Sequence, residues 1–324
     1  MSARLSCTFA LAVALGCAGK NDAGEPEIID DSEGTAAVDD DDDDGDDAGS
    51  TTVRDPESTG ATVPGSSDEA ADDGPVSFDL GPSVDAPGQD ERCEEQVDVV
   101  FVMDVSTSMG GFLATMADQM LVVDQAIQDL ALGTEPRYGL AVFVDDYLLV
   151  NEGMAYDDVT VLAADFDMWS TFTASNSQVN GGGFNTTFPE NSLDPLVAAA
   201  NEFEWRPIGA TTRIVIHTTD DTFWEAPEVA DGVVIQHDYV ETVDALQDEQ
   251  VRVFSFAAML GGPGENEDVT MGWFGPYGAE LAIPEATDGG VFHIDDVLGG
   301  TVSLADAIVS AVEDSYCEPY DPQG

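Results

Sequence analysis

Positive charge is what this sequence has least of. Its 324 residues include 8 Lys and Arg against 66 Asp and Glu, which gives a formal net charge of -58 at pH 7. Proteins that bind DNA or RNA neutralise phosphates with Lys and Arg, so the composition excludes nucleic acid as a partner. It equally excludes docking on an anionic membrane through a basic patch.

Signatures of common enzymes are also missing. The sequence has no H-E-x-x-H pair, no Walker loop and no G-x-S-x-G turn, which argues against the common hydrolases and nucleotide-binding enzymes. Histidine is scarce, and His217, His237 and His293 have no Cys or His partner at metal-ligand spacing. We therefore expect structural roles for the histidines and predict that the protein is not an enzyme.

The N-terminus carries an export signal. Arg4 is followed by the short apolar run 5–15, which is typical of a secretory signal peptide and too short to cross a membrane. The run ends in Ala14-Leu15-Gly16-Cys17, which resembles a bacterial lipobox except that Leu stands two positions before the Cys instead of three. We predict a signal over 1–17 with lipidation at Cys17; the alternative is plain secretion with cleavage at another small residue.

Cysteine is nearly absent from the rest of the chain. Of the four Cys, Cys7 and Cys17 belong to the signal, which leaves Cys93 and Cys317. An even pair in an exported protein predicts a disulfide, and this one would hold the two ends of a single domain together. The alternative is a pair of free, buried thiols.

Apolar and acidic residues are unevenly distributed. Hydrophobic residues make up 43% of the chain, more than a wholly disordered acidic chain would carry. Residues 18–92 show no apolar periodicity and contain the acidic run 39–44, so we predict a disordered acidic linker that acts as a spacer. The folded domain is predicted over 93–317, followed by a tail over 318–324.

Strand and helix patterns alternate after Cys93. Runs of β-branched residues predict buried strands over 97–103, 138–144, 213–217, 251–258 and 290–294. Apolar residues at helical spacing predict helices over 113–132, 191–203, 239–250, 280–287 and 302–316. The alternation predicts an α/β fold with a Rossmann-like, doubly wound, mostly parallel central sheet flanked by helices on both faces.

Oxygen-bearing side chains follow the first predicted strand. Asp104, Ser106 and Ser108 stand at alternating positions on the loop that leaves it. One carboxylate and two hydroxyls are hard ligands, suited to Mg²⁺, Mn²⁺ or Ca²⁺ more than to zinc. Ligands of α/β sheets bind beyond the carboxyl ends of the strands, which is where this loop is predicted to lie.

Two later loops bring oxygen atoms to the same edge. Strand 213–217 runs into Thr218-Thr219-Asp220, and the glycine-rich loop 181–191 contains Thr186, Thr187 and Glu190. Three such loops converging on one edge are a more specific signal than any one of them.

With these motifs, the sequence from about 96 to 317 resembles a von Willebrand factor A domain with a metal-ion-dependent adhesion site. Segment 138–145, the loop ending in Pro189-Glu190 and the turn at Asp220 are most similar to the I-like domain of integrin β subunits. The sequence departs from those subunits after the first motif. Met109-Gly110-Gly111 lacks the paired acids of their adjacent inhibitory calcium site, so we expect no second ion there.

The resemblance implies a role for each loop. Ser106 and Ser108 would bind a divalent cation directly, whereas Asp104 and Asp220 would hold it largely through bound water. Mg²⁺ is the expected ion, with Mn²⁺ or Ca²⁺ as alternatives. One coordination position would stay open for an Asp or Glu of a protein partner.

The ligand from the middle loop stays open. Thr187 stands at the family's usual threonine position, Glu190 matches the integrin β type, and Thr186 is a further alternative. Aromatic residues near this edge are also open to two interpretations, because Trp224, Trp273 and Phe274 would be either core residues or exposed contact anchors.

The expected function is a metal-dependent, adhesion-type protein-binding module in the cell envelope or outside the cell. Alternatives are an accessory subunit of an enzyme complex and a structural envelope component whose ion stabilises the fold. Charge poses a difficulty, because an acidic partner would be repelled by the acidic domain unless salt or basic groups of the partner compensate. Between the two cysteines the basic residues are Arg137, Arg206, Arg213 and Arg252.

Overall fold

A computed structural model describes residue 93 and residues 96–130, 132–261 and 268–323. Within them lies a six-stranded sheet of order β3-β2-β1-β4-β7-β8 and a separate two-stranded sheet, β5-β6. The predictions for signal 1–17, Cys17 and linker 18–92 lie outside the described residues. No helix in the described part of the chain is long and apolar enough to cross a membrane.

The elements alternate along the chain as the sequence predicts. The strands are β1 (Gln96–Asp104), β2 (Arg137–Phe143), β3 (Tyr147–Leu149), β4 (Thr211–Thr219), β5 (Val229–Ala230), β6 (Val233–Val234), β7 (Val251–Ala257) and β8 (Gly290–His293). The helices are α1 (Gly110–Asp129), α2 (Val159–Phe172), α3 (Leu193–Glu202), α4 (Tyr239–Asp248), α5 (Ile283–Ala286), α6 (Ile294–Leu298) and α7 (Leu304–Tyr316). The short 3₁₀ turns are η1 (Thr107–Met109), η2 (Val150–Gly153) and η3 (Thr173–Ser175).

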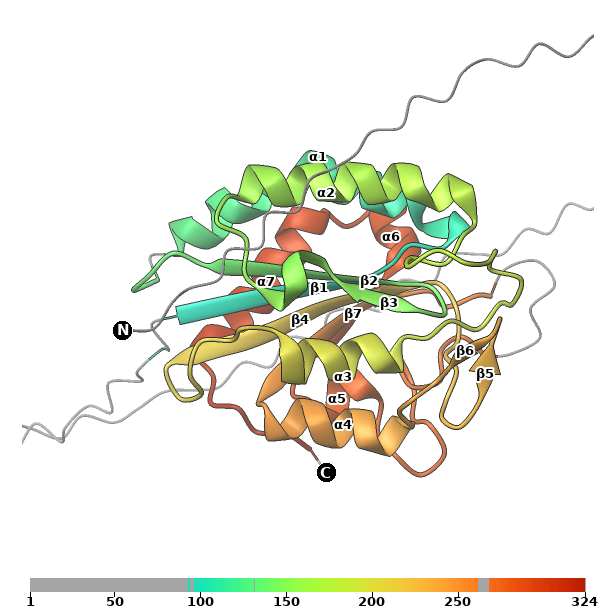
Figure 1. The fold of residues 1–324 in the computed structure, drawn as a ribbon. Coiled ribbons are helices and arrows are strands. Elements are labelled where there is room, and N and C mark those ends of the chain that lie inside the picture. The colour runs from blue at the N-terminus through green and yellow to red at the C-terminus, as the bar shows by residue number, and fades with distance from the viewer. Residues whose placement is uncertain (1–92, 94–95, 131, 262–267, 324) are drawn as a thin grey trace, which may run out of the picture. The chain divides into compact units, whose positions relative to one another are not determined.

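The large sheet is mostly parallel, which confirms the predicted α/β class. Strand β1 pairs in parallel with both β2 and β4, and β7 pairs in parallel with β4 and β8. Strand β3 is antiparallel to β2 and forms one edge. Because the parallel strands point the same way, the loops that leave β1, β2 and β4 all emerge on the same side, at the carboxyl ends of the strands (Figure 1). We call this side the edge that carries the candidate site.

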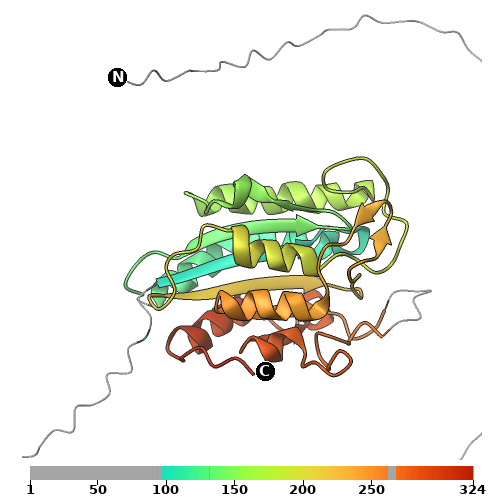
Figure 2. The same ribbon diagram turned by 60° about the horizontal axis from the view of Figure 1, so that its bottom comes forward.

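Helices lie against both faces of the sheet (Figures 1 and 2). Alternate residues of β1 pack into two separate cores, as the period of two in a strand requires. Phe101 and Met103 join the core formed with α1, α2 and α7. Val100 and Val102 join the core formed with α3, α4 and α5. The strand is therefore buried on both sides, which explains why its sequence is an unbroken apolar run.

Several elements differ from the sequence-based prediction, among them α2 and β4. Helix α2 was not predicted, although Leu162, Phe166 and Trp169 form its buried stripe and the Asp158 carboxylate caps it by accepting from Thr160 N over 2.8 Å. Strand β4 is longer at both ends than the predicted 213–217, because its terminal threonines keep pairing with β1 and β7.

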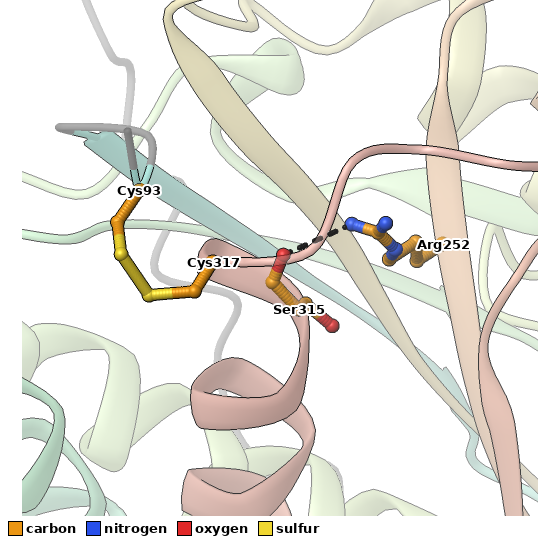
Figure 3. Close-up of a disulfide and its surroundings, with 4 residues drawn as sticks. All are labelled: Cys93, Arg252, Ser315 and Cys317. Atoms are coloured by element: carbon orange, nitrogen blue, oxygen red, sulfur yellow. Dashed lines mark hydrogen bonds between the residues drawn. A yellow bond between two sulfur atoms is a disulfide. The ribbon is translucent and has the colours of Figure 1, made fainter. Parts of the chain in front are cut away.

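A disulfide joins Cys93 to Cys317, as predicted, across 224 positions of sequence. It links a residue three positions before the start of β1 to the residue that follows α7 (Figure 3). Arg252 of β7 stabilises the same helix end, since its guanidinium donates to Ser315 O over 3.1 Å and to Asp288 Oδ2 over 2.7 Å. The last turn of α7 is thus held by a covalent bond and by a buried arginine.

Candidate metal centre

The loop after β1 is organised by the carboxylate of Asp104. This residue ends the strand and is fully buried. Its Oδ1 accepts a hydrogen bond from Ser106 N over 2.7 Å, and its Oδ2 accepts from Thr219 Oγ1 over 3.4 Å. The Ser106 and Ser108 hydroxyls lie 3.2 Å apart. Alternation along the loop therefore places both hydroxyls on one side, next to a buried carboxylate.

The loop after β4 meets this loop directly. Ser108 Oγ donates to Asp220 Oδ1 over 2.9 Å. The two strands are neighbours, and their parallel register pairs Met103 with Thr218. The residues that follow each strand therefore face one another, as the sequence predicts for two oxygen-bearing loops at one edge.

The middle loop contributes Glu190, which is only 2% exposed. Its carboxylate lies beside that of Asp104, and Asn185 Nδ2 donates to its Oε1 over 3.2 Å. Its Oε2 is buried and has no hydrogen-bond partner among the described atoms. Burial, followed by the neighbouring Asp104 carboxylate, raises the pKa of Glu190 well above its usual range. Burial likewise raises the pKa of Asp104.

Of the three middle-loop candidates, Glu190 lies beside Asp104 and Thr186 is bonded to Asp231. Thr186 donates through N and Oγ1 to the Asp231 carboxylate, both over 2.6 Å, toward the β5-β6 hairpin. The Thr187 hydroxyl lies near Asp145, although its Oγ1 is buried and forms no hydrogen bond of good geometry with a described atom.

Asp145 is a buried acid that the sequence analysis did not include among the site residues. It follows β2, its Oδ2 accepts from Gln178 Nε2 over 2.5 Å, and its Oδ1 is buried without a hydrogen-bond partner in the described part of the chain. Burial raises the pKa of Asp145 to about 6. An acid directly after a buried strand is the same signal that identified Asp104 and Asp220, so this residue could have been found in the same way.

No arginine of the described residues lies at this edge of the sheet. Arg137 and Arg213 stand opposite Asp98 near the start of β1, and Arg206 donates to the Asp98 carboxylate over 2.7 Å. Arg252 lies near the start of β7. All four therefore lie at the amino ends of the strands, and the acids at the carboxyl ends receive no compensating charge from them.

The donor set depends on hydroxyls as well as carboxylates. The described residues contain no group of three or more His, Cys, Asp and Glu side chains arranged to hold a metal ion. The predicted set combines the hydroxyls of Ser106, Ser108 and Thr187 with the carboxylates of Asp104, Glu190 and Asp220, and these three acids do not form such a group.

The aromatic residues near this edge are buried or half-buried. Trp273 is 1% exposed and stacks on His217 with ring centroids 4.3 Å apart, so its interpretation as an exposed contact anchor is wrong. Trp224 and Phe274 are half-buried. Of the two interpretations left open by the sequence, the core residue is therefore the one confirmed for Trp273.

Comparison with known proteins gives no family. No protein-family model matches the sequence, and no curated protein matches it. Among solved structures, two of proximal thread matrix protein 1 from the mussel byssus are similar at 14% and 16% identity, with TM-scores of 0.36 and 0.40. Each match covers 71% of this chain and 48% of the other, so the chain spans about half the length of that protein.

Proposed function

We propose that the folded part of this protein is a doubly wound von Willebrand factor A-type domain that binds a protein partner through a divalent cation. The observation that carries the proposal is the pair of buried carboxylates, Asp104 and Glu190, which lie side by side with no Arg or Lys of the described residues near them. Two desolvated carboxylates in contact repel each other unless a proton or a cation lies between them.

The donor chemistry fits a hard divalent cation. Serine hydroxyls and carboxylate oxygens are the ligands that Mg²⁺, Mn²⁺ and Ca²⁺ prefer, and the buried Glu190 Oε2 is left without a partner by the described atoms. Ser106, Ser108 and Glu190 would hold the ion directly, with Asp104 and Asp220 behind them. Thr187 is the alternative ligand from the middle loop.

Several groups of the chain itself keep these ligands in position. Asp104 orients the Ser106 backbone, and Ser108 connects the first loop to Asp220. Glu190 is tied to the loop after β4 through its backbone, since its N donates to Thr222 O over 3.0 Å. When bound, the ion would offer an open coordination position to a carboxylate of the partner.

Thermal unfolding of the full chain in EDTA, Mg²⁺, Mn²⁺ and Ca²⁺ tests the metal. A ligand that binds only the folded state raises the free energy of unfolding by about 2.7 kcal/mol when its free concentration is a hundred times its Kd. For a domain of this size we expect Tm to rise by roughly 5–10 °C with the preferred ion. The Ser106→Ala variant should lose most of that shift. No shift with any ion at millimolar concentration would refute the metal centre.

Partner binding separates the proposal from the alternative of an ion that only stabilises the fold. Under the proposal, the immobilised chain captures its protein partner in the presence of Mg²⁺ and releases it in EDTA. A metal-dependent Tm without metal-dependent capture favours the structural envelope component. Capture of the subunits of an enzyme complex favours the accessory-subunit alternative.

We also propose that the protein is exported and anchored through lipid at Cys17. The apolar run 5–15 and the lipobox-like Ala14–Cys17 support this proposal. Expression with a radiolabelled fatty acid tests it, because label should enter the wild type and be lost in Cys17→Ala. Secretion of unlabelled wild type would support cleavage without lipidation.

A further inference from the structure

A pocket of about 340 Å³ lies next to the candidate metal centre, on the loop that follows β4. Aromatic rings, prolines and two carboxylates line it, and its lining residues include Pro189, Phe223, Trp224, Glu225, Glu228 and Tyr277. None of these residues is among the proposed metal ligands. The pocket combines ring surfaces with negative charge, which is the chemistry that recognises an organic cation.

Backbone hydrogen bonds connect the pocket to the metal centre. Glu190 N donates to Thr222 O, and Trp224 N donates to Glu190 O, each over 3.0 Å. Glu190 and Phe223 form a short parallel β-bridge. The pocket thus begins at Pro189, one residue along the chain from the buried Glu190, so one partner surface can contact both sites.

The pocket wall is held by packed rings. Phe223 and Tyr277 have ring centroids 5.0 Å apart, and both pack on Tyr239, with centroids 5.6 and 4.8 Å from its ring. Glu225 is fixed as well, because its carboxylate accepts from Tyr277 Oη over 2.6 Å and from Tyr239 N over 3.0 Å. The wall is therefore formed before a ligand arrives, which lowers the entropy cost of binding.

The pocket acids have no cationic partner within the described part of the chain. None of the ion pairs between described residues involves Glu225 or Glu228. The described arginines lie near the amino ends of the strands, on the opposite side of the sheet from the pocket. A positive charge that balances these acids would come from another molecule.

We propose that this pocket binds the guanidinium or ammonium group of an Arg or Lys side chain of the partner, close to the acidic residue that would approach the metal centre. The identity of the partner rests on the proposed function, but the affinity for a cationic side chain does not require the metal. A basic residue of the partner beside its acidic one would also offset the repulsion of that acid by the acidic domain.

Small probes test the pocket without knowledge of the partner. N-acetyl-arginine amide is titrated into the full chain in EDTA, with N-acetyl-citrulline amide as an uncharged isostere. The readout is the Trp224 indole N–H resonance, assigned by its absence in Trp224→Phe. We expect a saturable shift with the arginine probe at millimolar concentration and a much weaker response to the citrulline probe. Equal responses to the two probes, or no response to either, would overturn the proposal.

A matched pair of variants locates the charge. Glu228→Gln changes an exposed pocket acid, and we expect about fivefold weaker binding of the arginine probe. Glu313→Gln changes an exposed acid on α7 and should leave the affinity unchanged. Unfolding curves confirm that both variants fold. An unchanged affinity in Glu228→Gln would count against the pocket. Because the titration is done in EDTA, it is independent of whether the metal centre is correct.

Discussion

Ser108 donates a hydrogen bond from its hydroxyl to Oδ1 of Asp220 over 2.9 Å, although 112 positions of sequence separate the two residues. The bond joins the loops that leave β1 and β4, and both loops are parts of the proposed metal centre. Removing either side chain would therefore disturb both loops, which makes this contact the most direct place to test the site.

Ser108→Ala should abolish most of the stabilisation by Mg²⁺ while costing little in EDTA. The variant lacks one hydroxyl ligand, but the lost hydrogen bond is exposed and is worth only about 0.5–1.5 kcal/mol. Thermal unfolding with and without the ion measures both effects. Ser310→Ala is the control, since this serine on α7 bonds Asp314 over 3.2 Å, also at the surface. If Ser108→Ala kept the full Mg²⁺ shift, Ser108 would not be a ligand.

Glu190→Gln should stabilise the protein in EDTA and remove its response to the ion. The neutral amide no longer repels Asp104, and its oxygen can still accept from Asn185 Nδ2. We expect a gain of about 1–2 kcal/mol in unfolding free energy at pH 7, because an unpaired buried charge is costly. Urea unfolding measures it, with the exposed Glu313→Gln as control. A clear loss of stability in EDTA would contradict the view that Glu190 is destabilising without a cation.

His217 should make the protein sensitive to acid. The ring is fully buried between Phe143 and Trp273, and burial lowers its pKa from 6.5 to about 3. As pH falls below 6.5 the unfolded state takes up the proton first, so stability is lost progressively down to about pH 3. Between pH 7 and pH 4.5 we expect the unfolding free energy of the wild type to fall by about 2–3 kcal/mol more than that of His217→Phe.

The control for this effect is Ser255→Ala, which removes the hydroxyl that lies 2.8 Å from His217 Nδ1 but keeps the imidazole. Its unfolding free energy should be lower at every pH and should follow the wild-type pH dependence. Parallel curves for wild type and His217→Phe would show that this histidine does not cause the acid sensitivity.

Loss of the disulfide should lower stability without changing the fold. The bond closes most of the folded domain into one loop. Constraining the unfolded chain in this way adds up to about 4–5 kcal/mol to the free energy of unfolding. The Cys93→Ser, Cys317→Ser double variant should therefore unfold at lower urea concentration with an unchanged far-ultraviolet circular dichroism spectrum. An unchanged urea midpoint would mean that Arg252 and the packing of α7 hold the domain ends without it.

Most of the sheet could be predicted, but parts of the segment between β2 and α3 could not. Strands β1, β2, β4 and β7 are buried on both faces, and short runs rich in apolar residues reveal them. Helix α2 was missed because its stripe of three buried residues is interrupted by acids. Strand β3 is three residues long and was not recognisable before its pairing with β2 was known.

From the sequence alone one could predict the long strands, the disulfide pair and the oxygen-bearing residues after β1 and β4, but not every helix and strand between them. These features depend on residue type and spacing along the chain. Tertiary contacts were needed to show that Glu190 lies beside Asp104, that Trp273 packs on His217, and that the arginines lie near the amino ends of the strands. These are contacts between residues distant in sequence, and strand register and loop conformation set them.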